Sequence, residues 1–259
     1  MNKPHRSSFL IEPLEQRALL AASGNYIVSF YGLGGGGSFG SDWLDKTVDT
    51  AGAETGAVVR KYNEDDGGRA LKDFLSSVDR NHNRRIDKSE VATATVRVIG
   101  YSLGGVQAVN FARYLLRVGD TIKGFLIGQG TPITSLVTID PVNSSPLKST
   151  VGVPDNVYNF SNYYQQKGGD TTIDLYTRTT PSFKVSSQTY EDPLDIKGEA
   201  LATEARGNNQ VRIDVGIYQD ETVKHKVQDN LDGKLKGRDT NHGTIPFFAY
   251  DLAVRDLTT

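Results

Sequence analysis

A serine lies between glycines at the point where a predicted strand meets a predicted helix. Residues 96–105 read Val-Arg-Val-Ile-Gly-Tyr-Ser-Leu-Gly-Gly, so Ser102 is the centre of a Gly-x-Ser-x-Gly pattern. The apolar run 96–99 and the amphipathic stretch 106–118 supply the strand before it and the helix after it. Such a turn projects the hydroxyl at the carboxyl end of a sheet, and the N–H of Leu103 points to the same space, where it can stabilise an oxyanion. The pattern predicts a nucleophilic serine; the alternative is a glycine-rich packing turn.

The elements around this turn alternate between strands and helices. Strands are predicted at 26–30, 57–62, 96–99, 136–139, 157–164 and 211–215, and helices at 67–78, 106–118 and 244–257. This alternation favours an α/β fold with a mostly parallel central sheet and helices on both faces. Residues 166–206 are polar and poorly periodic, which indicates an excursion over the sheet. A chain of 259 residues suits one large domain, assigned to 25–259.

The stretch 96–105 resembles the nucleophile elbow of the lipase and esterase branch of the α/β-hydrolase superfamily. The resemblance covers roughly residues 26–258 and implies a triad in the order Ser, acid, His. It also implies a second oxyanion N–H from the loop after the first strand. Tyr31-Gly32-Leu33-Gly34 occupies that loop and looks like the His-Gly-x loop of lipases, with Tyr31 in place of His. We expect Leu33 as the second donor, with Gly34 as the fallback and a flexible surface turn as the alternative.

The expected acid is Asp140, which follows the predicted strand 136–139. The run Ile139-Asp140-Pro141 is similar to the Leu-Asp-Pro segment of pancreatic-type lipases. The resemblance implies that Asp140 orients the catalytic histidine and stabilises its imidazolium form. Asp174 and Asp214 are rivals, and an Asp that caps a loop is the alternative.

The chain has four histidines, so the base can be approached by elimination. His5 lies near the N-terminus, His82 lies in a polar loop, and His225 is flanked by lysines in a segment that looks solvated. His242 lies in the loop that opens the terminal helix, where the resemblance places the catalytic base.

Residues 79–90 follow the twelve-residue register of an EF-hand loop. The expected Ca²⁺ ligands are the side chains of Asp79, Asn81, Asn83, Asp87 and Glu90 and the backbone carbonyl of Arg85. Arg84 stands where glycine is expected, and a left-handed turn there costs on the order of 1–2 kcal/mol. We expect weak, structural binding, on the order of 10⁻⁴–10⁻³ M, with no metal needed for catalysis. The alternative is an Asx-rich turn that holds no ion.

Residues 1–24 differ from the rest and are assigned to an N-terminal leader. Ile11-Glu12-Pro13-Leu14-Glu15-Gln16-Arg17-Ala18-Leu19-Leu20 looks like the Leu-Glu-Pro-Arg-x-Leu-Leu motif of exported proteins in planctomycete-type bacteria. We therefore expect an exported or cell-surface protein, with a cytoplasmic location and a fraying N-terminal helix as the alternatives. A secretory signal would need an uninterrupted apolar stretch, which the charged residues here break.

Composition argues against several classes of function. A net charge of -2 gives no electrostatic case for nucleic acid, no apolar run nears the roughly 18 residues of a membrane span, and the absence of cysteine excludes thiol catalysis. The leading hypothesis is a serine hydrolase that cleaves a small-molecule or lipid ester through an acyl-enzyme. An acyltransferase or thioesterase could use the same triad. A catalytically silent hydrolase fold that binds calcium or mediates adhesion is the alternative from another class.

Overall fold

Strands of the central sheet all run in the same direction. The computed structural model describes residues 24–37, 40–141, 151–164, 213–215, 225–230 and 245–259. Within these residues a six-stranded sheet has the order β11-β9-β7-β4-β1-β2, and every neighbouring pair is parallel. Its strands are β1 (Asn25–Phe30), β2 (Val58–Tyr62), β4 (Thr95–Tyr101), β7 (Ile133–Ile139), β9 (Val157–Tyr164) and β11 (His225–Asn230). The carboxyl ends of these strands therefore meet at one edge, where parallel sheets carry their functional loops.

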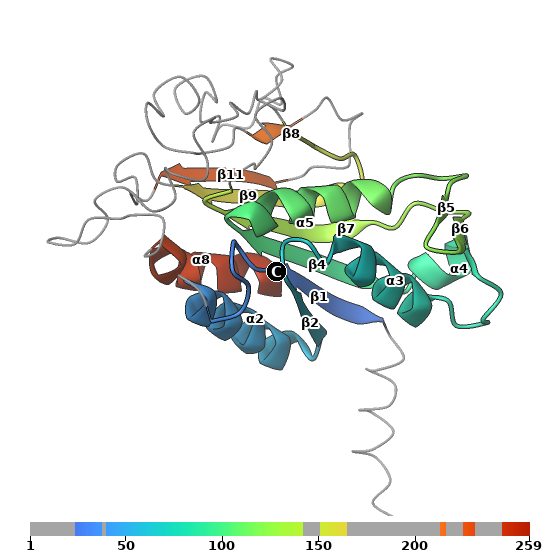
Figure 1. Ribbon diagram of the computed structural model, residues 1–259, viewed down its shortest axis with the longest axis horizontal. Coiled ribbons are helices and arrows are strands. Elements are labelled where there is room, and N and C mark those ends of the chain that lie inside the picture. Colours follow the sequence, from blue (N-terminus) through green and yellow to red (C-terminus); the bar gives the residue numbers. More distant parts are fainter. Residues whose placement is uncertain (1–23, 38–39, 142–150, 165–212, 216–224, 231–244) are drawn as a thin grey trace, which may run out of the picture.

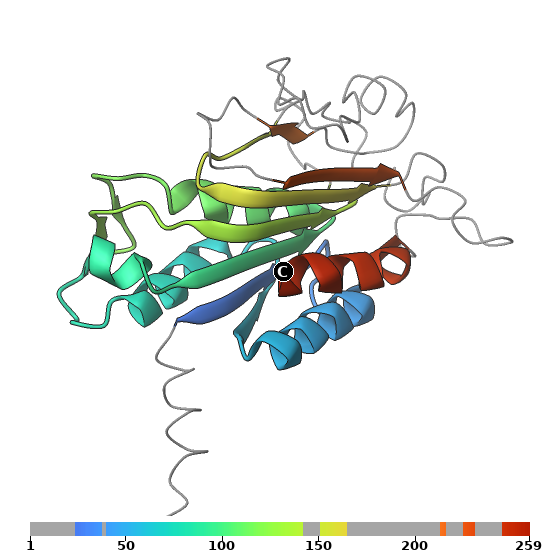
Figure 2. The same cartoon turned by 180° about the vertical axis from the view of Figure 1, so that it is seen from behind.

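Helices cover both faces of the sheet, which confirms the predicted fold class (Figures 1 and 2). One face is covered by α3 (Gly67–Val78) and α5 (Leu103–Tyr114), the other by α2 (Ser41–Thr55) and α8 (Ile245–Thr258). Alternate residues of β1 enter the two cores, with Val28 facing Phe74 and Phe111 and with Ile27 facing the α2 and α8 side. Burial on both faces explains why the strands are continuous apolar runs rather than alternating ones.

Smaller elements extend the domain at its rim. A two-stranded sheet pairs β8 (Val151–Val153) with β10 (Ile213–Val215), and a three-stranded sheet joins β3 (Arg85–Ile86), β6 (Phe125–Ile127) and β5 (Thr121–Ile122). The short helix α4 (Lys88–Val91) follows β3. No helix within the described parts of the chain is long and apolar enough to cross a membrane.

Two predicted elements need correction, and two observed elements were not predicted. The strand expected at 211–215 does not join the central sheet, because β10 pairs with β8, and the sixth central strand is β11, which was not predicted. Helix α5 begins at Leu103 rather than at residue 106, since it starts directly from the serine turn. Helix α2 was also not predicted; its amphipathic pattern is weak, with polar Ser41 and Thr47 among its buried residues.

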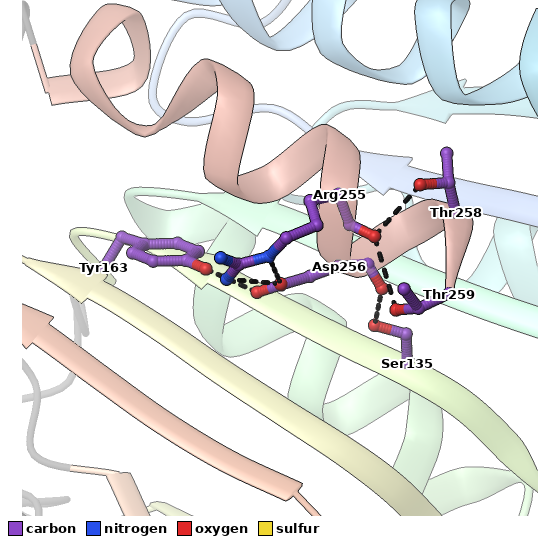
Figure 3. A network of polar contacts seen from close by, with 6 residues as sticks. All are labelled: Ser135, Tyr163, Arg255, Asp256, Thr258 and Thr259. Carbon is purple, nitrogen blue, oxygen red and sulfur yellow. Dashed lines mark hydrogen bonds and ion pairs between the residues drawn. The ribbon is translucent and has the colours of Figure 1, made fainter.

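The C-terminal end of α8 is tied to two strands of the sheet (Figure 3). Tyr163 in β9 donates its hydroxyl to the carboxylate of Asp256, and Ser135 in β7 donates to the Asp256 carbonyl at 2.7 Å. Arg255 holds the other carboxylate oxygen of Asp256 at 2.9 Å. Tyr163 is fully buried, so this hydrogen bond to a charged acceptor fixes α8 against the sheet.

Tyr163→Phe tests this contact. Burial, together with the hydrogen bond to Asp256, raises the pKa of Tyr163 above its ordinary value of 10.0. The unfolded chain therefore loses this proton near pH 10 while the native chain keeps it, so the stabilisation is complete below pH 10 and declines above it. We expect Tyr163→Phe to cost about 1.5–3 kcal/mol at pH 7 and to make the decline of stability above pH 10 shallower by about 1.4 kcal/mol per pH unit. Denaturant unfolding at pH 7, 10 and 11 measures both, and identical curves for the two proteins would contradict the account.

Candidate active site

Ser102 is held in a strained backbone conformation between β4 and α5. Its φ of 57° and ψ of -126° are unfavourable for a residue with a side chain. Its N–H donates to the carbonyl of Ile139 on the neighbouring strand at 3.0 Å, and Ser102 is only 4% exposed. Strain of this size persists only where the surroundings enforce it, and such positions are concentrated at functional sites.

The flanking glycines of the motif are required by close backbone approach. A Cβ on Gly100 would lie 2.1 Å from the carbonyl oxygen of Gly104, and one on Gly104 would lie 2.2 Å from the carbonyl oxygen of Phe30. Neither glycine has a positive φ. The first turn of α5 therefore presses against the ends of β4 and β1, and this contact forces the sharp turn at Ser102.

The glycine-rich loop after β1 lies against Ser102. A Cβ on Gly32 would be 2.7 Å from Ser102 Cβ and 3.2 Å from Ser102 Oγ. The Gly35 N–H donates to the Gly32 carbonyl at 3.1 Å, which closes a turn with Gly34 at a φ of 88°. That hydrogen bond does not use the N–H groups of Leu33 and Gly34, the two predicted donors. We name residues 32–35 the oxyanion turn, for the role predicted for it.

Leu103, the other predicted oxyanion donor, is the first residue of α5. The N–H groups in the first turn of an α-helix have no acceptor within the helix, and the helix dipole places partial positive charge there. The N–H of Leu103 is thus at the end of the helix that suits an anion. Its position directly after Ser102 agrees with the requirements of the motif.

Asp140 is brought to the same edge of the sheet. Tyr101 pairs with Ile139, so Ser102 and Asp140 are the next residues on adjacent strands. Asp140 is 1% exposed, has a φ of 40°, and donates its N–H to the carbonyl of Tyr163 at 2.6 Å. A Cβ on Gly105 would lie 2.7 Å from Pro141 Cβ, so the segment after Asp140 lies beside the start of α5.

Neither histidine within the described residues lies at the edge of the sheet that carries Ser102. His225 is the first residue of β11, and His82 lies in the loop that leads from α3 toward the start of β4. Because the strands are parallel, both lie toward the amino edge, opposite Ser102. His242 and His5 fall outside the described residues. Of the rival acids, Asp214 lies in β10 of the two-stranded sheet, and Asp174 falls outside the described residues.

The predicted calcium loop is closed by hydrogen bonds from its backbone to its own side chains. The Asp79 carboxylate accepts the N–H groups of Asn83 at 3.1 Å and Arg84 at 3.0 Å, and the Asn83 side chain accepts the N–H of Arg85 at 2.7 Å. Arg84 has a φ of 58°, the left-handed conformation predicted for the sixth position. Asp79 and Glu90 are both 4% exposed.

The carboxylates of this loop are engaged with backbone donors. Glu90 accepts from the N–H of Arg80 at 2.9 Å and from that of Asp87 at 3.1 Å. Asp87 caps α4, and the hydrogen bond from the Ser89 hydroxyl lowers the pKa of Asp87. Across the described residues, no group of three or more His, Cys, Asp or Glu side chains is arranged to hold a metal ion. The carboxylates of Asp87 and Glu90 already accept backbone N–H groups, and calcium binding stays a prediction.

A polar chain behind the glycine loop was not predicted. Tyr31 donates its hydroxyl to Asp45 Oδ1 at 2.5 Å, and Lys61 Nζ lies 2.7 Å from the same oxygen and 2.9 Å from Asp49. These groups come from the end of β1, from α2 and from β2, so no local spacing in the sequence announces them. The amphipathic face of α2 could have pointed to Asp45 only if α2 itself had been predicted.

The comparisons with known proteins are distant. No protein-family model matches the chain. The multifunctional-autoprocessing repeats-in-toxin of Vibrio vulnificus is 26% identical over 120 residues, which are 46% of this chain. The chain covers only 2% of the length of that toxin.

Two solved structures are similar over most of this chain. A protein assigned to the α/β superfamily of hydrolases, from Xanthomonas campestris pv. campestris, has a TM-score of 0.36 and 11% identity, covering 91% of this chain and 96% of that one. A cutinase-like protein from Cryptococcus sp. has a TM-score of 0.31 and 13% identity, covering 91% of this chain and 95% of that one. Because these scores are low, the function of this chain has to be inferred from its own strands and residues.

Proposed function

We propose that this protein is a serine hydrolase that cleaves carboxylic esters. The observation that carries the proposal is the strained backbone of Ser102 at the carboxyl edge of a parallel sheet, beside both the oxyanion turn and Asp140. A packing turn would need the glycines but not a buried serine at a positive φ. The presence of Ser102, Asp140 and His242 in this order along the chain supports the proposal.

The roles of the residues follow from acyl-transfer chemistry. His242 takes the proton of the Ser102 hydroxyl as Oγ attacks the ester carbonyl, and the N–H groups of Leu103 and Leu33 stabilise the resulting oxyanion. The protonated His242 then gives its proton to the leaving alcohol. Water, deprotonated by His242, releases the acid from the acyl-enzyme. Asp140 keeps the imidazole in the required tautomer and stabilises the imidazolium, without taking the proton itself.

Asp140→Asn tests the assignment of the acid. We expect kcat for p-nitrophenyl acetate to fall on the order of 10³–10⁴-fold, because an amide in place of the carboxylate supports the wrong imidazole tautomer. Asp155→Asn is the control, since Asp155 is an exposed aspartate in the loop before β9. If Asp140→Asn keeps its kcat within twofold and Asp174→Asn loses it, the acid is Asp174 and the assignment of Asp140 is wrong.

We also propose that the loop 79–90 binds Ca²⁺ as a structural ion. The left-handed Arg84 and the buried Asp79 and Glu90 support this, and binding requires the two carboxylates to exchange backbone donors for the ion. Weak affinity matches the millimolar calcium outside cells, which agrees with the proposed export. The loop lies toward the amino edge of the sheet, so the ion would act on stability and not on the reaction at Ser102.

Thermal unfolding with and without calcium tests this site. We expect 5 mM CaCl₂, which is roughly five times or more the expected dissociation constant, to raise the Tm by a few degrees through binding to the native state. Glu90→Gln should remove the rise. Glu54→Gln, the same substitution at an exposed position of α2, should retain it. A Tm that does not respond to calcium in the unsubstituted protein would show that the loop only looks like an ion site.

A further inference from the structure

A movement of the oxyanion turn would change the distance between its N–H groups and Ser102. Gly32 is in contact with Ser102, at a distance that would leave no room for a side chain. Donors of an oxyanion hole act when they lie about 2.7–3.1 Å from the position that the oxyanion takes. Whatever holds residues 32–35 in place therefore also sets the position of the Leu33 N–H relative to Ser102 Oγ.

Tyr31 follows the end of β1 and is the residue through which the loop begins while still hydrogen-bonded to the sheet. Its N–H donates to the carbonyl of Tyr62 on β2 at 2.8 Å, and the oxyanion turn begins at the next residue. The ring of Tyr31 packs against the loop directly after the oxyanion turn, since a Cβ on Gly36 would lie 3.4 Å from the ring and 3.7 Å from its hydroxyl oxygen. Tyr31 is 8% exposed, so the ring fills the space between the loop and the core on the α2 side.

The hydroxyl of Tyr31 connects this support to helix α2. It donates to Asp45 at 2.5 Å, a distance typical of a bond to a charged acceptor. Lys61 on β2 lies 2.7 Å from the same oxygen, so Asp45 Oδ1 is held between the Tyr31 hydroxyl and an ammonium group that Asp49 shares. Burial, followed by the contact with Asp45, raises the pKa of Tyr31 above its ordinary value of 10.0.

We propose that Tyr31 is a positioning residue for ester hydrolysis: its ring packs against the loop at Gly36, and its hydrogen bond to Asp45 fixes the oxyanion turn against Ser102. The inference rests on the proposed function. It assigns to Tyr31 a role through the turn, and no contact with the substrate.

Tyr31→Phe removes the hydrogen bond and keeps the ring. We expect about a tenfold fall in kcat for p-nitrophenyl acetate with KM unchanged, because only binding of the oxyanion is weakened. The second-order rate of labelling by a fluorophosphonate should fall to a similar degree, because negative charge develops on its phosphoryl oxygen at the same donors as Ser102 Oγ displaces fluoride. The control is Tyr62→Phe, which removes a hydroxyl from a tyrosine of 3% exposure that contacts Asp73 instead. Equal kcat and labelling rates in the two variants would overturn the proposal.

Asp45→Asn provides a second route if Tyr31→Phe does not fold. The amide keeps an acceptor for Tyr31 but lacks the charge, so we expect a smaller loss of kcat than in Tyr31→Phe. The double variant should be no slower than Tyr31→Phe alone, because both changes act on one hydrogen bond. Losses that multiply, or an Asp45→Asn variant with unchanged kcat and labelling rate, would contradict the proposal.

Labelling by the fluorophosphonate distinguishes a failure of the proposed hydrolase function from a failure of the role of Tyr31. If the unsubstituted protein is not labelled by the fluorophosphonate, the proposed function fails and the role of Tyr31 fails with it. If Ser102 is labelled and Tyr31→Phe reacts at the same rate, only the positioning role is wrong.

Discussion

Replacing Ser102 with Ala is expected to abolish hydrolysis of p-nitrophenyl esters while the Tm stays within a few degrees of its original value. Removing the nucleophile of a triad lowers kcat by a factor on the order of 10⁴–10⁶. Stability should change little, since alanine carries the same Cβ and adopts the same strained φ of 57°. Initial rates and thermal unfolding of the two proteins give both quantities.

Two further substitutions sharpen this result. Ser102→Gly should be as inactive as Ser102→Ala. Its free energy of unfolding should be about 1 kcal/mol higher than that of Ser102→Ala, because glycine adopts a positive φ without strain. Ser76→Ala, at an exposed serine of α3, should leave activity unchanged. If Ser102→Ala retains more than a few per cent of the hydrolysis rate, Ser102 is not the nucleophile. If Ser102→Gly is less stable than Ser102→Ala, the strain at this residue is not what the φ value indicates.

Gly104→Ala is expected to have the largest effect on folding. The added Cβ would lie 2.2 Å from the carbonyl oxygen of Phe30 and 2.3 Å from that of Tyr31. Both are backbone atoms at the end of β1, so neither can rotate away, and α5 must separate from the sheet. We expect a loss of about 3 kcal/mol or more in the free energy of unfolding, or no folded protein at all. Circular dichroism and denaturant unfolding measure the effect.

Gly130→Ala is the matched control for this substitution. The nearest atoms to a Cβ on Gly130 lie 3.5 and 3.8 Å away, which is ordinary van der Waals contact. Its φ is not positive, so alanine fits there without strain. We expect its Tm to be close to that of the unsubstituted protein. A Gly104→Ala variant as stable as Gly130→Ala would mean that α5 and β1 are not in close backbone contact.

Periodicity and glycine placement were sufficient to predict much of the fold. Helix α3 (Gly67–Val78) was predicted with its observed bounds, since its apolar residues recur at helical spacing and enter one core. The apolar runs of β1, β4 and β7 were also recognised, because strands buried on both faces leave a continuous signal. Strand β11 was missed, since His-Lys-Val-Gln-Asp-Asn is polar and only its pairing with β9 makes it a strand. Local pattern does not contain that pairing.

The candidate site also contains residues that local sequence predicts and contacts that only the tertiary structure creates. Ser102 and its glycines were predicted because a strained turn has strict local requirements. A left-handed residue at Arg84 was predicted because the sixth position of the EF-hand register requires one. That Asp140 lies beside Ser102 depends on the register of β4 and β7, which are separated by helix α5 and the hairpin of β5 and β6. The support from Tyr31, Asp45 and Lys61 likewise joins three elements that only the tertiary structure brings together.

The most direct test of the account is intact-mass labelling with a fluorophosphonate probe, since it detects an activated serine without knowledge of the ester. The protein should gain one adduct per chain, and the adduct should be absent from Ser102→Ala. The labelled peptide should contain Ser102. A folded, calcium-supplemented protein that gains no adduct, or an adduct that persists in Ser102→Ala, would contradict the proposal that Ser102 is the nucleophile of a hydrolase.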